Sequence, residues 1–128
     1  MPHITFEYSD NLDVDTRKFL AALHERLSAT GIVASKGLKS RALRFDDWYI
    51  SDGSEDYAFA HLNMLIRGGR SAEEKERLTR EAIALLEETF AERRENGYIS
   101  LSVDIKEMLE GEHVTRHNIP NRREEGAL

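Results

Sequence analysis

The sequence contains no cysteine, which excludes disulfide bonds, thiol nucleophiles and thiolate metal sites. It has no apolar run that approaches the roughly 20 residues needed to span a bilayer. Its first residues also lack the basic and apolar stretches of a secretory signal. These absences favour a cytoplasmic protein that does not associate with membranes.

Acidic residues outnumber basic ones: the sequence has 24 Asp and Glu and 18 Lys and Arg, which gives a net charge of −6. Binding to nucleic acid depends on clustered cations, so we expect no nucleic-acid partner. A small anionic ligand remains compatible with this balance, since a local pair of cations can bind a carboxylate on an acidic protein.

The length of 128 residues fits a single domain spanning 1–128, with its core at about 2–110 and a polar C-terminal tail at 111–128. Within the core, alternating apolar residues predict four strands, at 3–8, 38–50, 57–67 and 98–106. Helically spaced apolar residues predict two helices, at about 13–30 and 72–95.

The order of these elements divides into two similar βαβ halves, one from Pro2 and one from near Tyr57. Such halves build an α/β (α+β) fold with one four-stranded sheet and both helices on one face. The turn-forming segment SDGSED also favours an antiparallel hairpin between the two middle strands.

The second face of this sheet has no helix to cover it. We expect apolar side chains there, from Leu43, Phe45, Phe59 and Leu65. An exposed apolar face favours association, so an oligomer is expected rather than a monomer.

Pro2 is the first candidate for chemistry. Removal of Met1 would leave Pro2 with a free secondary amine, and a free α-amino group has a reference pKa of about 8. Burial and nearby cations would lower this pKa, which suits a base that transfers a proton beside a carbonyl. The simpler alternative is that Pro2 only stiffens the start of an edge strand.

Arg70 is the second candidate, within the segment GGRS at 68–71. Ser71 and Glu74 have the spacing of a capping box, so the segment can be read as an ordinary helix start. The two preceding glycines would also let a ligand approach the backbone, and a guanidinium is suited to binding its carboxylate.

Lys39 and Arg41 form the third candidate, because residues two apart in a strand share a face. Two cations beside Leu43 suit an anionic and partly apolar ligand, although a solvated strand face would look the same. His113 and His117 have helical spacing but lack the glutamate of a zinc-protease motif. We therefore expect no metal site at these two histidines.

Several short segments recur together in one known family. They are MPH at the start, E-x-S-D-N at 7–11, ATGI at 29–32, KSR at 39–41, W…DG…DYAF…H at 48–61 and GGRS at 68–71. In this order and spacing, over about residues 2–110, they resemble 5-carboxymethyl-2-hydroxymuconate isomerase, a branch of the tautomerase superfamily.

The resemblance implies a tautomerase-like fold assembled as a homotrimer, with active sites near subunit contacts. It implies an isomerase that transposes C=C bonds without metal or organic cofactor, in the breakdown of the aromatic compound homoprotocatechuate. The substrate would be an unsaturated 2-hydroxy or 2-oxo di- or tricarboxylate, with 5-carboxymethyl-2-hydroxymuconate as the expected compound.

The resemblance also assigns roles to single residues. Pro2 matches the general base and acid, Arg70 the arginine that holds a substrate carboxylate, and Arg41 a basic residue of the second strand. Lys39 stands where the family usually has arginine, and lysine lacks the planar fork that binds a carboxylate in two places. The family's C-terminal segment contributes to the site or to trimer contacts, and the tail of this chain matches it only loosely, with Arg116 and Asn118 as the candidates for such a part.

Two alternatives remain open at this point. A non-catalytic ferredoxin-like binding or assembly module would explain the order of strands and helices. In such a module Pro2 and Arg70 would have no functional role. A related tautomerase with another 2-oxo acid as its substrate would keep the fold and Pro2, since Lys39 lies where specificity would be set.

Overall fold

The computed structural model describes residues 2–122. Met1 and residues 123–128 lie outside this range, so the removal of Met1 and the end of the expected tail are not described. In chain order the elements are β1 (His3–Ser9), α1 (Thr16–Ser28), the short 3-10 helix η1 (Ser35–Gly37), β2 (Lys39–Phe45), β3 (Tyr57–Arg67), α2 (Ala72–Thr89), α3 (Ala91–Asn96) and β4 (Tyr98–Met108).

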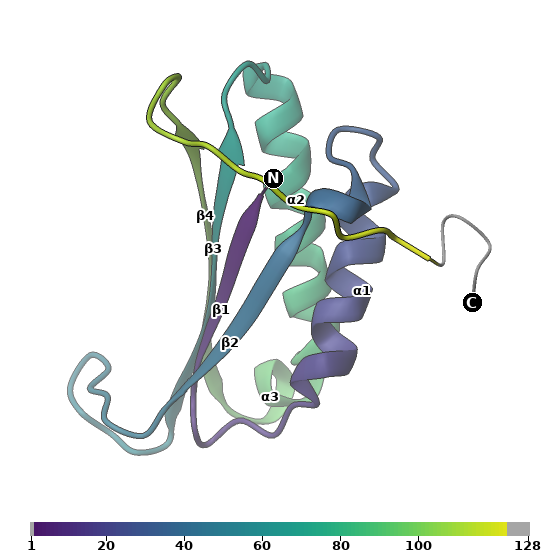
Figure 1. The fold of residues 1–128 in the computed structure, drawn as a ribbon. Coiled ribbons are helices and arrows are strands. Elements are labelled where there is room, and N and C mark those ends of the chain that lie inside the picture. Colours follow the sequence, from purple (N-terminus) through teal and green to yellow (C-terminus); the bar gives the residue numbers. More distant parts are fainter. Residues whose placement is uncertain (1, 123–128) are drawn as a thin grey trace.

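The four strands form one sheet in the order β2-β1-β3-β4. β1 pairs in parallel with β2 and β3 pairs in parallel with β4, while β1 and β3 join the two halves as an antiparallel pair. Helices α1 and α2 both cover the same face of the sheet (Figure 1). The predicted double βαβ fold is therefore confirmed. Among residues 2–122, no helix is long and apolar enough to cross a bilayer.

The predicted hairpin between the two middle strands is wrong, because β1 lies between β2 and β3. The crossover through α1 returns the chain beside β1, and residues 46–56 then carry it past β1 to β3. β2 also ends at Phe45, earlier than predicted. There the backbone N–H of Asp10 donates to the carbonyl of Phe45 (2.9 Å), and the indole N–H of Trp48 donates to the carboxylate of Asp10 (3.0 Å).

The second helix is interrupted at Phe90, where a single helix over 72–95 was predicted. Phe90 leaves helical geometry, with φ −108° and ψ 27°, and its side chain is only 4% exposed. Its ring centroid lies 6.4 Å from that of Phe6. Burial of this ring in the core thus accompanies the break between α2 and α3.

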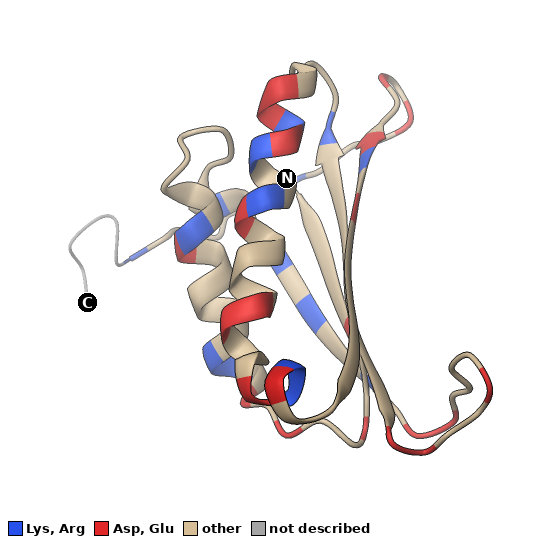
Figure 2. Cartoon of the chain, turned by 180° about the vertical axis from the view of Figure 1, so that it is seen from behind, with Lys and Arg blue, Asp and Glu red and all other residues tan. Residues whose placement is uncertain are grey.

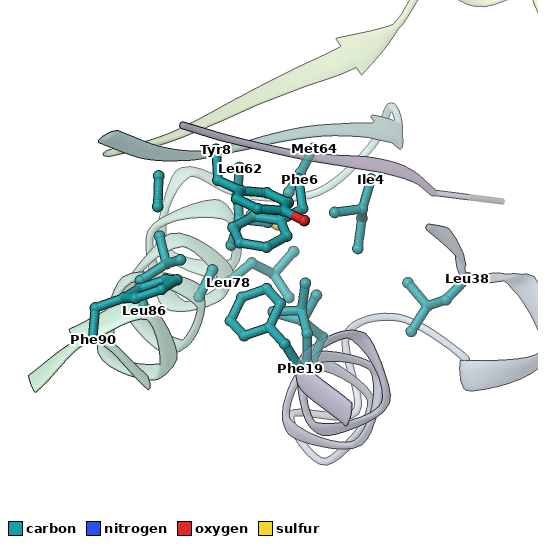
Figure 3. Close-up of a cluster of buried hydrophobic side chains, with 14 of the residues drawn as sticks. Ile4, Phe6, Tyr8, Phe19, Leu38, Leu62, Met64, Leu78, Leu86 and Phe90 are labelled. Carbon is teal, nitrogen blue, oxygen red and sulfur yellow. The ribbon is translucent and has the colours of Figure 1, made fainter. Parts of the chain in front are cut away.

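The hydrophobic core fills the space between the sheet and the helices (Figure 3). Phe6 of β1 lies at its centre and is fully buried. Its ring centroid is 5.0 Å from that of Tyr8 and 4.5 Å from that of Phe19, so β1 and α1 are joined by aromatic contacts. Leu78 and Leu86 of α2 close the core from the other helix.

The face of the sheet turned away from the helices carries the predicted apolar residues. Leu43 and Leu65 are 48% and 38% exposed there, and the rings of Phe45 and Phe59 lie 6.2 Å apart. This open face is not uniformly apolar, because the register places Glu7 between Leu43 and a histidine of β3.

We predict that Phe6→Ala lowers the free energy of unfolding by about 4 kcal/mol, because it removes a buried ring and leaves a cavity. Urea unfolding at fixed protein concentration measures the loss. Leu109→Ala is the control, since Leu109 is 68% exposed and its truncation should cost below about 0.5 kcal/mol. Equal losses for both variants would contradict a core centred on Phe6.

Candidate active site

Three segments that are distant in the sequence meet at one end of the sheet. Pro2 precedes β1 and is buried, and its carbonyl accepts a hydrogen bond from the backbone N–H of Lys39 (3.1 Å). Because His3 is paired with Leu65 in the antiparallel register, Pro2 lies one step further toward the end of β3. The starts of β1 and β2 and the end of β3 therefore surround Pro2.

Arg70 follows the end of β3 and is held by backbone carbonyls. Its Nη1 donates to the carbonyl of Arg67 (2.9 Å) and its Nη2 to the carbonyl of Ile32 (3.1 Å). Its Nε is buried and has no hydrogen-bond partner among the described residues. Each Nη carries a second hydrogen, so the guanidinium retains donors for a carboxylate while it ties β3 to the loop after α1.

The capping box at the start of α2 is confirmed. The Ser71 hydroxyl accepts from the backbone N–H of Glu74 (3.1 Å), and the Glu74 carboxylate accepts from the backbone N–H of Ser71 (2.9 Å). Gly69, with φ +101°, turns the chain into this cap in a conformation that favours glycine. Since the cap occupies these N–H groups, an anion at this helix end would depend on Arg70.

Arg41 and Lys39 lie on the open face at the start of β2. Arg41 donates to Nδ1 of His3 from Nη2 (2.8 Å) and Nη1 (3.4 Å). Lys39 Nζ lies 3.5 Å from the carbonyl of Gly37. Within residues 2–122, neither cation forms an ion pair with a carboxylate, so both charges remain available to an anion.

His3 is a site residue for which the sequence supplied no role. Burial lowers the pKa of His3, and the positive charges of Arg41, Lys39 and His113 lower it further. The alternation of β1 was a usable signal, since it puts His3 on the face that Lys39 and Arg41 share once β1 and β2 are known neighbours. The wrong prediction of a hairpin between β2 and β3 gave no indication that β1 and β2 are neighbours.

A cleft of about 580 Å³ opens beside the end of β3. Its walls include Gly68, Gly69, Glu107 and His113. Residues after β4 form one side of the cleft. This segment then crosses the sheet end at which β1 begins (Figure 1). The His113 ring centroid lies 6.3 Å from that of His3, which brings this cleft next to the candidate site.

Glu107 lies in the wall of the cleft as one half of an ion pair. Its carboxylate lies 2.6 Å from Lys75 Nζ, and this hydrogen bond is the main cause of a lowered pKa of Glu107, with smaller contributions from the backbone of Gly69 and the charge of Arg70. The positive charge of Lys75 therefore offsets the negative charge that Glu107 brings to the cleft wall.

The opposite end of the sheet contains none of the predicted site residues. A hollow of about 390 Å³ lies there between the starts of β3 and β4, with Tyr57, Arg94 and Tyr98 in its walls. The neighbouring loop at 46–56 is strongly acidic, as the red segments at the lower end of the sheet in Figure 2 indicate. An anionic ligand is better accommodated at the Pro2 end.

The sequence profile of the 5-carboxymethyl-2-hydroxymuconate isomerase family matches residues 2–123. The chain belongs to this family. It is 32% identical over 121 residues to a 5-carboxymethyl-2-hydroxymuconate Delta-isomerase from Escherichia coli, covering 93% of this chain and 96% of that protein. It is similar in structure to a 5-carboxymethyl-2-hydroxymuconate isomerase from Deinococcus radiodurans R1, with TM-score 0.86, 33% identity and coverage of 91% and 90% of the two chains.

A more distant similarity concerns the fold alone. A fused 4-OT wild-type symmetric trimer aligns with TM-score 0.71 at 12% identity, over 91% of this chain and 94% of that one. Together the comparisons place this chain among the isomerases and confirm the tautomerase-like fold. The non-catalytic module that the order of elements left open is no longer favoured.

We predict that Arg70→Lys lowers the free energy of unfolding by about 1 kcal/mol, because a single ammonium nitrogen replaces the two separate Nη atoms that reach the carbonyls of Arg67 and Ile32. Chemical denaturation measures the change. Arg67→Lys is the matched control, since the Arg67 side chain is exposed and should tolerate the exchange within about 0.5 kcal/mol. An unchanged free energy of unfolding in Arg70→Lys would show that these two hydrogen bonds contribute little to stability.

Proposed function

We propose that the protein is a cofactor-independent isomerase of 5-carboxymethyl-2-hydroxymuconate, acting in the cytoplasm in the breakdown of homoprotocatechuate. Family membership and the relatives named for this activity support the proposal. The observation that carries it is the location of Pro2, buried at the sheet end where Lys39 and Arg41 begin β2 and Arg70 follows β3.

Pro2 is the proposed proton carrier. Once Met1 is removed, its secondary amine is a base with a reference pKa of about 8, and nearby cations disfavour its protonated form. The nitrogen takes a proton from the 2-hydroxyl group or an allylic carbon of the substrate and returns it at the far end of the conjugated system. A C=C bond moves, and no atom is gained or lost.

Arg70, Arg41 and Lys39 are the proposed carboxylate ligands. Arg70 supports this role because its Nη atoms keep one hydrogen each beyond the carbonyl contacts. Arg41 and Lys39 support it because no carboxylate among residues 2–122 neutralises them. Positive charge fixed beside the substrate stabilises the dienolate as negative charge develops on it.

Lys39 is compatible with a second candidate substrate. An ammonium is a point charge without the planar fork of the family's arginine, so it fixes the orientation of a carboxylate less strictly. A related 2-hydroxy or 2-oxo acid with different carboxylate spacing is therefore the second candidate substrate.

A homotrimer is the proposed assembly. The open face supports it, because no element among residues 2–122 covers Leu43 and Leu65 there, and exposed apolar faces favour association. The fused 4-OT structures with the same fold are trimers.

We predict that a variant with one alanine inserted between Met1 and Pro2 isomerises 5-carboxymethyl-2-hydroxymuconate at least about 100-fold more slowly than protein beginning at Pro2. The insertion converts the Pro2 amine to an amide, which has no usable basicity. Ultraviolet absorbance follows turnover, and intact mass verifies the first residue of each protein. Pro2→Ala, which retains a primary amine, should lose less activity than the insertion.

Undiminished turnover in the inserted variant would overturn Pro2 as the base. No turnover by protein with a free Pro2 would instead move the proposal to the second candidate substrate, tested with a panel of enolisable 2-oxo acids. Failure across that panel would overturn the proposed function.

We predict that Leu43→Asp dissociates the trimer, because it buries a charge in the proposed subunit contact. Light scattering coupled to gel filtration should give three chain masses for the native protein and one for the variant. Val114→Asp is the control, since Val114 is 72% exposed on the chain after β4. A native protein of one chain mass would contradict the assembly.

A further inference from the structure

His3 and Arg41 form a pair whose protonation can be assigned from its geometry. Nδ1 of His3 lies 2.8 Å from Nη2 and 3.4 Å from Nη1 of Arg41. A guanidinium has donors only, so Nδ1 must accept and carries no proton. The ring proton is therefore on Nε2, and the imidazole is neutral in this arrangement.

The surroundings keep this imidazole neutral. Burial is the main cause of the lowered pKa of His3. Lys39 and Arg41 face it from β2 and His113 from the chain after β4, and all three lower the pKa further. On β3, the residue opposite His3 is the uncharged Leu65.

Among residues 2–122, no acid is positioned to reverse this effect. The nearest carboxylate on the same face of β1 is Glu7, four residues further along the strand, and its register neighbours are Leu43 and His61. Glu107 contacts Lys75 of α2 instead. The environment of His3 is therefore positive, and protonation of its ring would place two cations in contact.

A neutral partner has a different effect on an arginine from a charged one. Arg26 is held by the carboxylates of Glu81 and Glu88, which fix its guanidinium and also cancel its charge. His3 holds the Arg41 guanidinium by accepting from its two Nη atoms, and it does not cancel the charge of the guanidinium. A carboxylate at position 3 would instead compete with an anionic substrate for the same donors.

We propose that His3 is a positioning residue, whose neutral imidazole orients Arg41 so that the remaining N–H groups of the guanidinium bind a substrate carboxylate near Pro2. This inference rests on the proposed function. It adds a residue to the site that acts on substrate only through Arg41.

The test compares three replacements of His3 in full-length protein with verified loss of Met1. His3→Leu removes the acceptor, and KM should rise about tenfold, the effect of losing a hydrogen bond to a charged group, with kcat nearly unchanged. His3→Gln supplies a neutral oxygen acceptor and should restore KM to within roughly threefold. His3→Glu should raise KM more than His3→Gln, because its carboxylate neutralises Arg41.

The Arg41→Ala background separates positioning from a structural role. There His3→Leu should leave KM unchanged, because the residue through which His3 acts is absent. If His3→Leu raised KM equally in the native and the Arg41→Ala backgrounds, the proposal would be overturned. Equal KM values for His3→Glu and His3→Gln would overturn it as well. If His3→Leu does not fold, the comparison of Gln with Glu decides.

A second readout does not depend on turnover. Arg41→Ala should raise the pKa of the His3 imidazole, measured by NMR titration of its ring protons, because a neighbouring positive charge is removed. An unchanged pKa would overturn the pairing itself. If native protein turns over no substrate while this pKa shifts, the proposed function has failed and the His3–Arg41 pair stands without a catalytic role.

Discussion

The candidate site depends on the pairing of β1 with β2 on one side and β3 on the other. Parallel pairing starts β1 and β2 at one end of the sheet, and antiparallel pairing ends β3 at the same place. The hydrogen bond from the Lys39 N–H to the Pro2 carbonyl extends this ladder to the residue before β1. Backbone hydrogen bonds thus bring Pro2, the cations of β2 and the segment of Arg70 to one place.

The site also differs from the helical surface in how its cations are held. On the helices, Arg26 contacts Glu81 and Glu88, and such pairs cancel charge. At the site, Arg70 is bound by carbonyls and Arg41 by an imidazole. Dipolar and neutral acceptors fix a guanidinium but leave its charge intact. An anion can therefore find positive charge that no direct ion pair offsets among residues 2–122, on a protein whose net charge is −6.

Local patterns predicted the parts of the fold that local physics determines. Period-two alternation gave the four strands, and the Ser71–Glu74 spacing gave a capping box that the structure contains. Strand order is a choice among long-range pairings, so a turn-rich segment wrongly indicated a hairpin. The break at Phe90 reflects burial of a ring against Phe6. The contact of His3 with its arginine follows from strand order, so local alternation alone could not predict it.

The two βαβ halves give the sheet an approximate twofold symmetry, with β1 and β2 corresponding to β3 and β4. Under this symmetry, the Pro2 end corresponds to the hollow at Tyr57, where the second half begins. The residue equivalent to Pro2 is Asp56, which precedes β3, and its nitrogen is an amide within the chain that donates to the hydroxyl of Ser54 (3.3 Å). An amide has no basic lone pair, so the duplicated architecture offers two comparable ends and the proposed proton transfer can use only one.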